Sequence, residues 1–266
     1  MSYKVLCSDL DGTLLSTKND VSDFTITEIK RIKEDIRIIL TSARMPKSMT
    51  YLQQRMGITN MPIICYNGAL VLDGSKQVFS KTIDIITIEK IYQLAEENNI
   101  KLGLYHKDEW CVEETTERVV KEILHTKTTP IYRSTKETVS NWKHRTISAH
   151  KIMLMGTEET TDAVFPKLEK MFASAIHIYR SNATLIELTP KSVSKLSAIK
   201  LLLKENETLQ DVIAFGDNYN DMEMLQHVHC GVAVGNAREE VKAIANKVTL
   251  KNTEHGVAYF IAENIS

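Results

Sequence analysis

"KVLCSDLDGTLLST", residues Lys4–Thr17, places two aspartates, Asp9 and Asp11, directly after the first apolar run of the chain. Aspartate is a poor strand residue, and two neighbouring carboxylates repel each other. If the apolar run is a buried strand, both side chains lie near its carboxyl end and point the same way, because they are two residues apart. Gly12 then lets the chain turn without a Cβ clash. Such a pair needs a cation, and carboxylate oxygens favour Mg²⁺.

A second acidic stretch, "GDNYND" at Gly216–Asp221, follows a later apolar run, Val212–Phe215. Asp217 and Asp221 stand just past the end of that run, again beside a glycine. A single DxD segment is usually only a polar turn. Two acidic segments after two strands are more specific, because the carboxyl ends of strands in an open α/β sheet form its ligand-binding edge. Together they predict one shared metal site.

Five short apolar runs have the character of parallel strands buried on both faces. They are Lys4–Ser8, Arg37–Leu40, Pro62–Tyr66, Val212–Phe215 and Gly231–Val234. Between them, apolar residues recur every three or four positions in Ile26–Ile36 and Lys195–Lys204, which indicates helices. This alternation predicts an α/β fold with a Rossmann-like parallel-sheet core.

The middle of the chain has a different pattern. Helices are expected at Ile88–Asn98 and Asp162–Ala173, and strands at Lys101–Tyr105, Glu109–Val112, Lys151–Met155 and Ala175–Arg180. These groups indicate a small α+β domain inserted into the α/β one. The predicted core domain is therefore discontinuous, with residues 1–84 and 187–266, and the inserted domain spans residues 85–186.

Composition narrows the classes of partner. The chain has 266 residues and a net charge of −1, which gives no electrostatic argument for binding nucleic acid or an anionic membrane. No apolar run approaches the roughly 20 residues of a membrane span, and the first residues lack the plan of a signal peptide. The cysteines are scattered without a CxxC pair, which favours a cytoplasmic protein with reduced thiols. The "QHVHCG" stretch, Gln226–Gly231, is interpreted as a helix end rather than a zinc site.

At this point the chain resembles the haloacid dehalogenase superfamily, and within it the Cof-type, sugar-phosphatase-like branch with an inserted cap of subclass IIB. The resemblance rests on motifs that span nearly the whole chain in the order and spacing of the family. They are "DLDGTLL" (Asp9–Leu15), "TSAR" (Thr41–Arg44), "NGA" (Asn67–Ala69), "ELTPKSVSK" (Glu187–Lys195), "GDNYND" (Gly216–Asp221) and "GNA" (Gly235–Ala237).

The resemblance implies a role for each matching residue. Asp9 would attack the phosphorus and form an aspartyl-phosphate, and Asp11 would act as general acid and then as general base. Mg²⁺ would be held by Asp9, by the backbone carbonyl of Asp11 and by Asp217, and Asp221 would belong to the metal site, mainly by orienting its shell. Phosphate would be bound by Leu10, Ser42, Ala43, Lys195 and Asn220. Substrate contacts are assigned to Arg44 and Asn67.

Several assignments stay open on the sequence. Lys191 competes with Lys195 for the role of site lysine, although the spacing of Lys195 to the following helix matches the family better. Arg44 either contacts substrate or pairs with a carboxylate. Asn67 either contacts substrate or only forms a turn. Ala43 departs from the glycine that is common at this position, yet backbone N–H donation is expected to survive.

The resulting hypothesis is a Mg²⁺-dependent phosphatase that hydrolyses small phosphorylated metabolites, such as sugar phosphates or phosphorylated cofactors, through an aspartyl-phosphate. A phosphotransferase or phosphomutase is the alternative within the enzymes. A non-catalytic switch that is phosphorylated on Asp9 is the alternative outside them. No nucleic-acid or membrane partner is expected, and the oligomeric state is left open.

Overall fold

The computed structural model describes residues 3–17 and 19–265 and divides the chain into two compact units. The first unit contains residues up to 79 and from 194 onwards, and the second unit contains residues 80–193. These boundaries differ from the predicted positions 85 and 187. The difference at the second boundary arises because strand β11 (Leu185–Pro190) belongs to the sheet of the second unit as far as Pro190.

The first unit is built on a sheet whose central strand is β1 (Val5–Asp9). Parallel neighbours lie on both sides of it, β2 (Arg37–Thr41) and β12 (Val212–Gly216). The remaining strands extend outward as β13 (Cys230–Ala233) and β14 (Lys247–Val248) beyond β12, and β3 (Ile63–Cys65), β4 (Leu70–Asp73) and β5 (Lys76–Ser80) beyond β2. All five residues of β1 are buried, as the continuous apolar run predicts. The predicted α/β class with a parallel-sheet core is confirmed.

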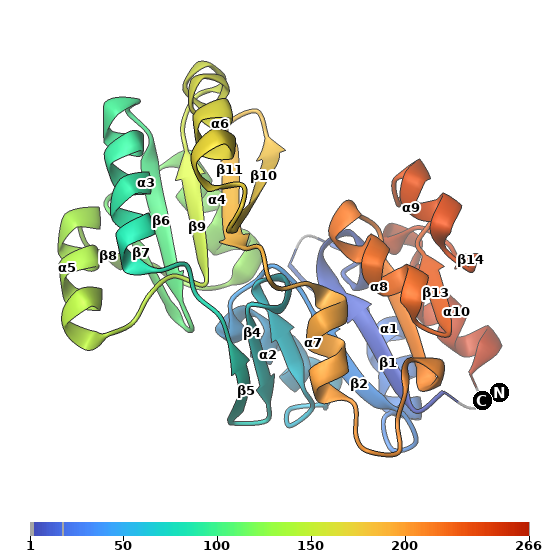
Figure 1. The fold of residues 1–266 in the computed structure, drawn as a ribbon. Coiled ribbons are helices and arrows are strands. Elements are labelled where there is room, and N and C mark those ends of the chain that lie inside the picture. Colours follow the sequence, from blue (N-terminus) through green and yellow to red (C-terminus); the bar gives the residue numbers. More distant parts are fainter. Residues whose placement is uncertain (1–2, 18, 266) are drawn as a thin grey trace. The chain divides into compact units, whose positions relative to one another are not determined.

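Helices connect these strands in two directions away from β1. The helices on the β2 side are α1 (Asp23–Ile32) and α2 (Pro46–Met56), and those on the β12 side are α8 (Met222–His227) and α9 (Glu239–Ile244). Right-handed crossovers that run in opposite directions place their helices on opposite faces of the sheet. Consistent with this, α1 packs with α2 and α10 (Gly256–Asn264), whereas α7 (Lys195–Leu202) packs with α8 (Figure 1). The strand order therefore reverses at β1, where open α/β sheets bind ligands.

Two local predictions for the first unit differ from the structure. Helix α1 begins at Asp23, where the hydroxyl of Ser22 accepts a hydrogen bond from the N–H of Thr25, and it ends at Ile32 rather than Ile36. The strands β4 and β5 were not predicted, although Asp73-Gly74 between them is a common turn signal. Among the described residues, no helix combines the length and apolarity that crossing a membrane requires.

The second unit has its own mixed sheet. Its strands run in the order β10 (Ile176–Asn182), β11, β9 (Lys151–Met155), β6 (Lys101–His106), β7 (Glu109–Val112) and β8 (Ile131–Tyr132). Neighbours are antiparallel except β7 and β8. Its helices are α3 (Ile85–Glu97), α4 (Glu117–Thr126), α5 (Thr135–Arg145) and α6 (Glu158–Phe172). The predicted α+β character is therefore observed, but the helices α4 and α5 and the strands β8 and β11 were not predicted.

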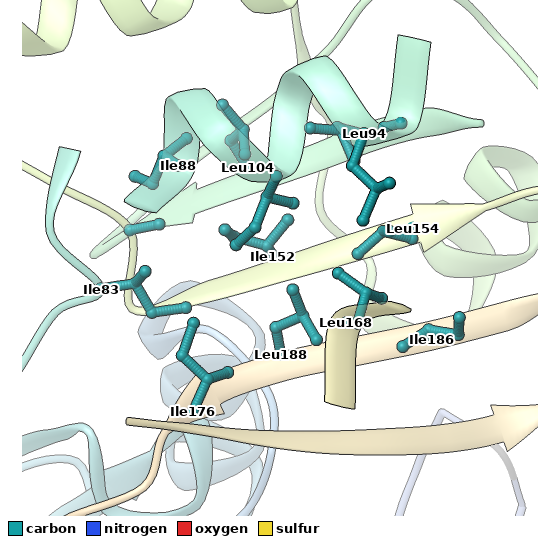
Figure 2. Packing of buried hydrophobic residues seen from close by; sticks show 14 of the residues in the cluster. Ile83, Ile88, Leu94, Leu104, Ile152, Leu154, Leu168, Ile176, Ile186 and Leu188 are labelled. Carbon is teal, nitrogen blue, oxygen red and sulfur yellow. The ribbon is translucent and has the colours of Figure 1, made fainter. Parts of the chain in front are cut away.

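One face of this sheet and its helices enclose a continuous apolar core. Ile88 and Leu94 of α3 pack over Leu104 and Ile152, and Leu168 of α6 packs beside them (Figure 2). Leu102 and Leu104 of β6, and Ile152 and Leu154 of β9, point to the same face because alternate side chains of a strand do so. The second unit thus buries a hydrophobic core of its own.

A buried histidine, His150, lies beside the start of the second unit. Its Nδ1 accepts a hydrogen bond from the N–H of Lys107 at 3.3 Å, so its Nε2 carries the proton and donates to the hydroxyl of Ser80 at 2.9 Å. The His106 ring lies 4.9 Å away, centroid to centroid. Burial, His106 and Lys107 lower the pKa of His150 to about 3, and burial also lowers the pKa of His106.

The pKa of His150 predicts a loss of stability in acid. Since its folded pKa lies below the unfolded value of about 6.5, the unfolded state takes up the proton first as the pH falls. The contribution of His150 to the free energy of unfolding is fully present above about pH 6.5. At pH 5, this contribution is smaller by about 2 kcal/mol. Urea unfolding between pH 7.5 and 5 should show this slope, and His150→Gln should flatten it. The same substitution at exposed His144 is the control; equal slopes for both variants would contradict the assignment.

Candidate active site

The chain leaves β1 in a single wide turn, η1 (Leu10–Leu14), in the first unit. The turn closes with a hydrogen bond from the N–H of Leu15 to the carbonyl of Leu10 at 3.0 Å. Gly12 has a φ of 86°, which L side chains rarely adopt, and a Cβ on it would lie 2.5 Å from Oδ2 of Asp217. Glycine is thus required twice here, for the backbone conformation and for the close approach of the turn to Asp217.

Three carboxylates meet at the carboxyl ends of β1 and β12. Asp9 is the last residue of β1, and Asp217 and Asp221 follow β12, with Asp221 ending the short helix η4 (Tyr219–Asp221). One carboxylate oxygen from each of the three lies within 4.8 Å of the others. The two acidic segments singled out in the sequence therefore lie together in space, as the topology of a parallel sheet requires.

A buried lysine joins two of these carboxylates. Nζ of Lys195, the first residue of α7, donates to Oδ1 of Asp9 and to Oδ1 of Asp221, each at 2.6 Å. The side chain of Lys195 is fully buried. Lys191 is instead exposed, and its Nζ donates to the carbonyl of Ala173 in the second unit. The lysine in contact with Asp9 is thus Lys195.

The other oxygens of the acidic cluster have defined donors. Oδ2 of Asp221 accepts from the N–H of Asp217 at 2.9 Å and from the N–H of Asn218 at 3.0 Å. Both oxygens of Asp221 are therefore occupied by the protein. Oδ1 of Asp217 accepts from the hydroxyl of Thr13 at 3.0 Å. Thr13 had no predicted role, although it belongs to the "DLDGTLL" motif.

Crowding and burial dominate the electrostatics of the cluster. Burial, together with the charges of Asp221, Asp217 and Asp11, raises the pKa of Asp9 well above its usual range, against the opposing effect of Lys195. Burial and Asp221 raise the pKa of Asp217 to about 6. Burial alone would lower the pKa of Lys195, but Asp221 and Asp9 raise it instead, so this lysine stays charged.

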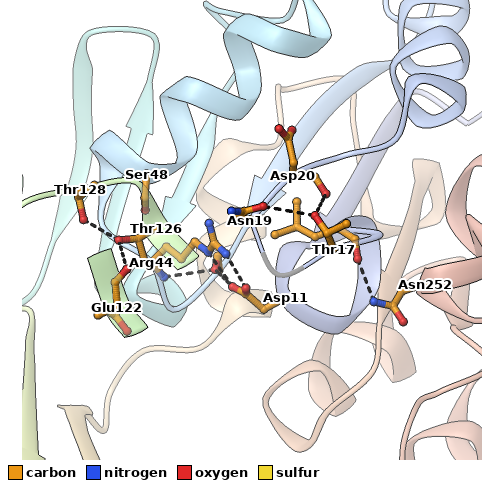
Figure 3. Close-up of polar contacts among 12 residues, drawn as sticks. Asp11, Thr17, Asn19, Asp20, Arg44, Ser48, Glu122, Thr126, Thr128 and Asn252 are labelled. Carbon is orange, nitrogen blue, oxygen red and sulfur yellow. Dashed lines mark hydrogen bonds and ion pairs between the residues drawn. The ribbon is translucent and has the colours of Figure 1, made fainter. Parts of the chain in front are cut away.

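The carboxylate of Asp11 pairs with a second positively charged side chain, that of Arg44, at the same edge of the sheet. Arg44 donates to its carboxylate in a bidentate pair, from Nε to Oδ2 at 2.8 Å and from Nη2 to Oδ1 at 2.6 Å (Figure 3). The Arg44 side chain is 5% exposed, whereas that of Asp11 is 51% exposed. Ser42, just after β2, lies beside the pair and accepts a hydrogen bond from the N–H of Arg44 at 3.2 Å. Of the two interpretations of Arg44, the structure shows the carboxylate pair.

The turn after β3 brings a further pair of side chains to this edge. Tyr66 and Asn67 in η2 (Tyr66–Gly68) both have left-handed backbones, with φ values of 53° and 55°. The N–H of Asn67 donates to the carbonyl of Ser42 at 2.9 Å, and Oδ1 of Asn67 accepts from Nδ2 of Asn220 at 3.1 Å. Left-handed non-glycine residues are uncommon and concentrate at functional sites. Here they place Asn67 against Asn220.

Comparison with known proteins identifies this arrangement. The haloacid dehalogenase-like hydrolase family matches residues 6–261, and a putative phosphatase of Haemophilus influenzae is 33% identical over 99% of this chain and 98% of its own length. The chain belongs to the haloacid dehalogenase-like hydrolase family. The 5-amino-6-(5-phospho-D-ribitylamino)uracil phosphatase of Bacillus subtilis is 28% identical over 98% of this chain and 97% of its own. The crystal structure of a haloacid dehalogenase-like hydrolase from Bacteroides thetaiotaomicron is 28% identical, with a TM-score of 0.89, and covers 98% of this chain and 99% of that chain.

The site of this family member fits a divalent cation. Among the described residues, Asp9, Asp217 and Asp221 lie together around one buried cation, Lys195, while Asp11 pairs with Arg44. The three clustered carboxylates carry more negative charge than Lys195 balances, and this charge adds to burial in raising the pKa values of Asp9 and Asp217. Carboxylate oxygens are the donors that hard divalent cations prefer. The cluster can therefore hold a metal, and Asp9 and Asp217 are the members with oxygens available for it.

The remaining predicted residues fall into two groups. Leu10 and Ala43 follow β1 and β2, so their backbones lie at the same edge of the sheet as the cluster. The histidines of "QHVHCG" serve the fold, because Nδ1 of His227 contacts the carbonyl of Glu223 and Nδ1 of His229 contacts Oε1 of Gln210. Among the residues that the structure describes, the aspartate cluster is the group suited to hold a metal.

Proposed function

We propose that this hydrolase is a Mg²⁺-dependent phosphatase that acts on small phosphorylated metabolites through an aspartyl-phosphate. The observation that carries the proposal is the position of Asp9. It is a buried carboxylate held at a strand end by Lys195, inside a cluster with excess negative charge, and Asp11 follows two residues later. The relatives support it, since both curated relatives described above are named phosphatases, one of them for a phosphorylated ribitylamino-uracil.

Asp9, Asp217 and the backbone carbonyl of Asp11 would hold Mg²⁺. When bound, the ion shields the attacking carboxylate from the negative phosphate and stabilises the charge that develops on the phosphoryl oxygens. Asp221 would act indirectly, because its oxygens already bind Lys195 and two backbone N–H groups. It fixes Lys195 and the backbone of Asp217, and thereby the geometry of the metal ligands.

Asp9 would supply the nucleophile. Its carboxylate oxygen forms a bond to phosphorus while the bond from phosphorus to the ester oxygen breaks, and the electron pair leaves with that oxygen. Lys195 stays protonated beside Asp9 and balances the charge of the transferred phosphoryl group. The hydroxyl of Ser42, the amide of Asn220 and the backbone N–H groups of Leu10 and Ala43 would bind phosphoryl oxygens.

Asp11 would move the protons. It donates one to the leaving ester oxygen, and its carboxylate then removes one from the water that attacks phosphorus and releases Asp9. The bidentate pair with Arg44 holds Asp11 as an acceptor, so the donor role requires the Asp11 side chain to turn away from Arg44. Between proton transfers, Arg44 therefore holds the Asp11 side chain in place.

The direct test is phosphate release from a panel of sugar phosphates, nucleotides and phosphorylated cofactors, with Mg²⁺ and with chelator. The proposal expects release that requires the metal. Transfer of the phosphoryl group to an added alcohol in place of water would favour the phosphotransferase alternative. A stable phosphoprotein with no release from any ester would favour the switch.

Asp11→Asn gives a separate prediction. The amide can still accept from Arg44 but cannot exchange protons, so kcat for an alkyl phosphate should fall by about 10²–10⁴-fold. Hydrolysis of p-nitrophenyl phosphate should suffer less in the first step, because its leaving group needs no protonation. Burst kinetics with both substrates would separate the two steps. An equal, small loss for both substrates would remove Asp11 from the mechanism.

A further inference from the structure

Two asparagines from the far end of the chain bind the turn η1. The carbonyl of Gly12 accepts from Nδ2 of Asn236, and the carbonyl of Leu15 accepts from Nδ2 of Asn252, both at 2.8 Å. Figure 3 shows Asn252 beside the segment that follows the turn. Asn236 belongs to the "GNA" motif, to which neither the sequence nor the proposed chemistry assigns a role.

The two asparagines are also bonded to each other. Oδ1 of Asn236 accepts from the backbone N–H of Asn252 at 2.8 Å. The NH₂ group of each asparagine therefore donates to a carbonyl of the segment Gly12–Leu15, and the side-chain oxygen of Asn236 accepts from the backbone of Asn252. The amide of Asn236 offers both the donor and the acceptor that this arrangement uses, whereas a carboxylate would place an oxygen against the carbonyl of Gly12. We call this pair the asparagine clamp.

The clamp rests on a tightly packed backbone. The N–H of Gly235 donates to the carbonyl of Leu250 at 3.0 Å, and a Cβ on Gly235 would lie 2.9 Å from the nitrogen of Lys251. The loop after β13 and the start of η5 (Asn252–Glu254) are thus fixed side by side. Side chains on such a rigid backbone can fix the position of the turn whose carbonyls they bind. Water molecules bound to the same carbonyls would not fix it.

The turn needs such support because it is irregular. Asp11 and Gly12 depart from helical backbone angles, so η1 cannot complete a helical ladder of hydrogen bonds. The same turn carries the carboxylate and the carbonyl of Asp11, and Thr13 holds Asp217. A displacement of η1 would therefore move several groups of the carboxylate cluster together.

We propose that the asparagine clamp is a positioning device for η1 that sets the Mg²⁺ affinity of the carboxylate cluster and the rate of turnover. Neither asparagine contacts the reacting atoms, so both act through the turn. The kinetic part rests on the proposed phosphatase function, whereas the effects on the turn and on metal binding do not require turnover.

The test compares Asn236→Ala, Asn252→Ala and the double variant in the full chain. Asn246→Ala is the matched control, because Oδ1 of Asn246 binds the N–H of Gly231 at 2.7 Å, a backbone contact outside the turn. Three quantities are measured: hydrogen exchange of peptides covering residues 10–17, the Mg²⁺ concentration at the midpoint of thermal stabilisation, and kcat and KM for the best substrate of the panel.

Each clamp variant should speed exchange in residues 10–17 and raise the Mg²⁺ midpoint about tenfold, as loss of outer-shell support typically does. The kcat should fall about tenfold while KM changes by less than about twofold, since the substrate contacts remain. The double variant should be little worse than the worse single variant, because both asparagines belong to one network. Asn246→Ala should leave all three quantities as in the wild type.

Wild-type exchange in residues 10–17 and a wild-type Mg²⁺ midpoint in the clamp variants would overturn the proposal, as would equal changes in Asn246→Ala. Failure of the proposed function looks different. A wild-type protein that binds Mg²⁺ but releases no phosphate would refute the phosphatase, while exchange and the Mg²⁺ midpoint would still decide on the clamp.

Discussion

Asp9→Asn is expected to abolish phosphate release, with a loss in kcat of at least about 10⁴-fold, in a protein that keeps its fold. The amide has nearly the shape of the carboxylate, and its oxygen can still accept from Lys195. It cannot, however, form an acyl phosphate, so no phosphoprotein should be trapped by acid quenching during turnover. Phosphate release, mass spectrometry of quenched protein and thermal unfolding test the three parts of this expectation.

The control for Asp9→Asn is Asp23→Asn, at the exposed first position of α1. It removes the same charge from the same unit without touching the cluster, and its kcat should equal that of the wild type. Activity of Asp9→Asn within about tenfold of the wild type would exclude the aspartyl-phosphate. The mechanism would then have to be direct attack of water on phosphorus.

Lys195→Met should remove both activity and much of the stability. The substitution leaves Asp9 and Asp221 buried without their cation, and breaking a buried pair in this way costs about 3–5 kcal/mol. Methionine fills a similar volume, so the loss reports on charge rather than on a cavity. Urea unfolding measures the free energy, and phosphate release measures the activity.

Lys191→Met provides the contrast. Lys191 is exposed and is the lysine that competed with Lys195 on sequence spacing, and in the described structure its Nζ donates to the carbonyl of Ala173. Its substitution should change the free energy of unfolding by no more than about 0.5 kcal/mol and leave the activity intact. Equal effects of the two substitutions would mean that the buried ion pairs of Lys195 do not form in solution.

The strands of the first unit were predictable because burial on both faces demands continuous apolar runs, as in Val5–Asp9 and Val212–Gly216. Other elements were missed for identifiable reasons. The hairpin of β4 and β5 has partly exposed strands, so its signal is the Asp73-Gly74 turn rather than its hydrophobicity. Helix α5 has few apolar residues, so its signal is the capping box of Ser134 and Glu137. In α4, the apolar residues include the exposed Val120 and Leu124.

Some features of the candidate site could likewise be predicted from the sequence, and others could not. The meeting of Asp9 with Asp217 follows from parallel strands ending at one edge, which the sequence pattern contains. The choice of Lys195 over Lys191, and of a carboxylate partner for Arg44, depends on where side chains point after the helices pack. The contacts of Asn236 and Asn252 could not be predicted from the sequence for another reason. They contact backbone carbonyls more than 200 residues away in the chain. Every residue has a backbone carbonyl, so the sequence does not indicate which of them these side chains contact.

The position of β1 between β2 and β12 has a consequence for synthesis on the ribosome. Residues 80–193, with their own apolar core, leave the exit tunnel before β12 does, so this part can assemble while β1 still lacks one neighbour. Until residues 212–216 arrive, β1 presents an unpaired apolar edge, which favours association with other chains or with chaperones. Lys195 and Asp217 arrive in the same late portion. The nascent chain therefore gains the carboxylate cluster and its lysine only after β12 has emerged, and a product terminated earlier would carry Asp9 without Lys195 and Asp217.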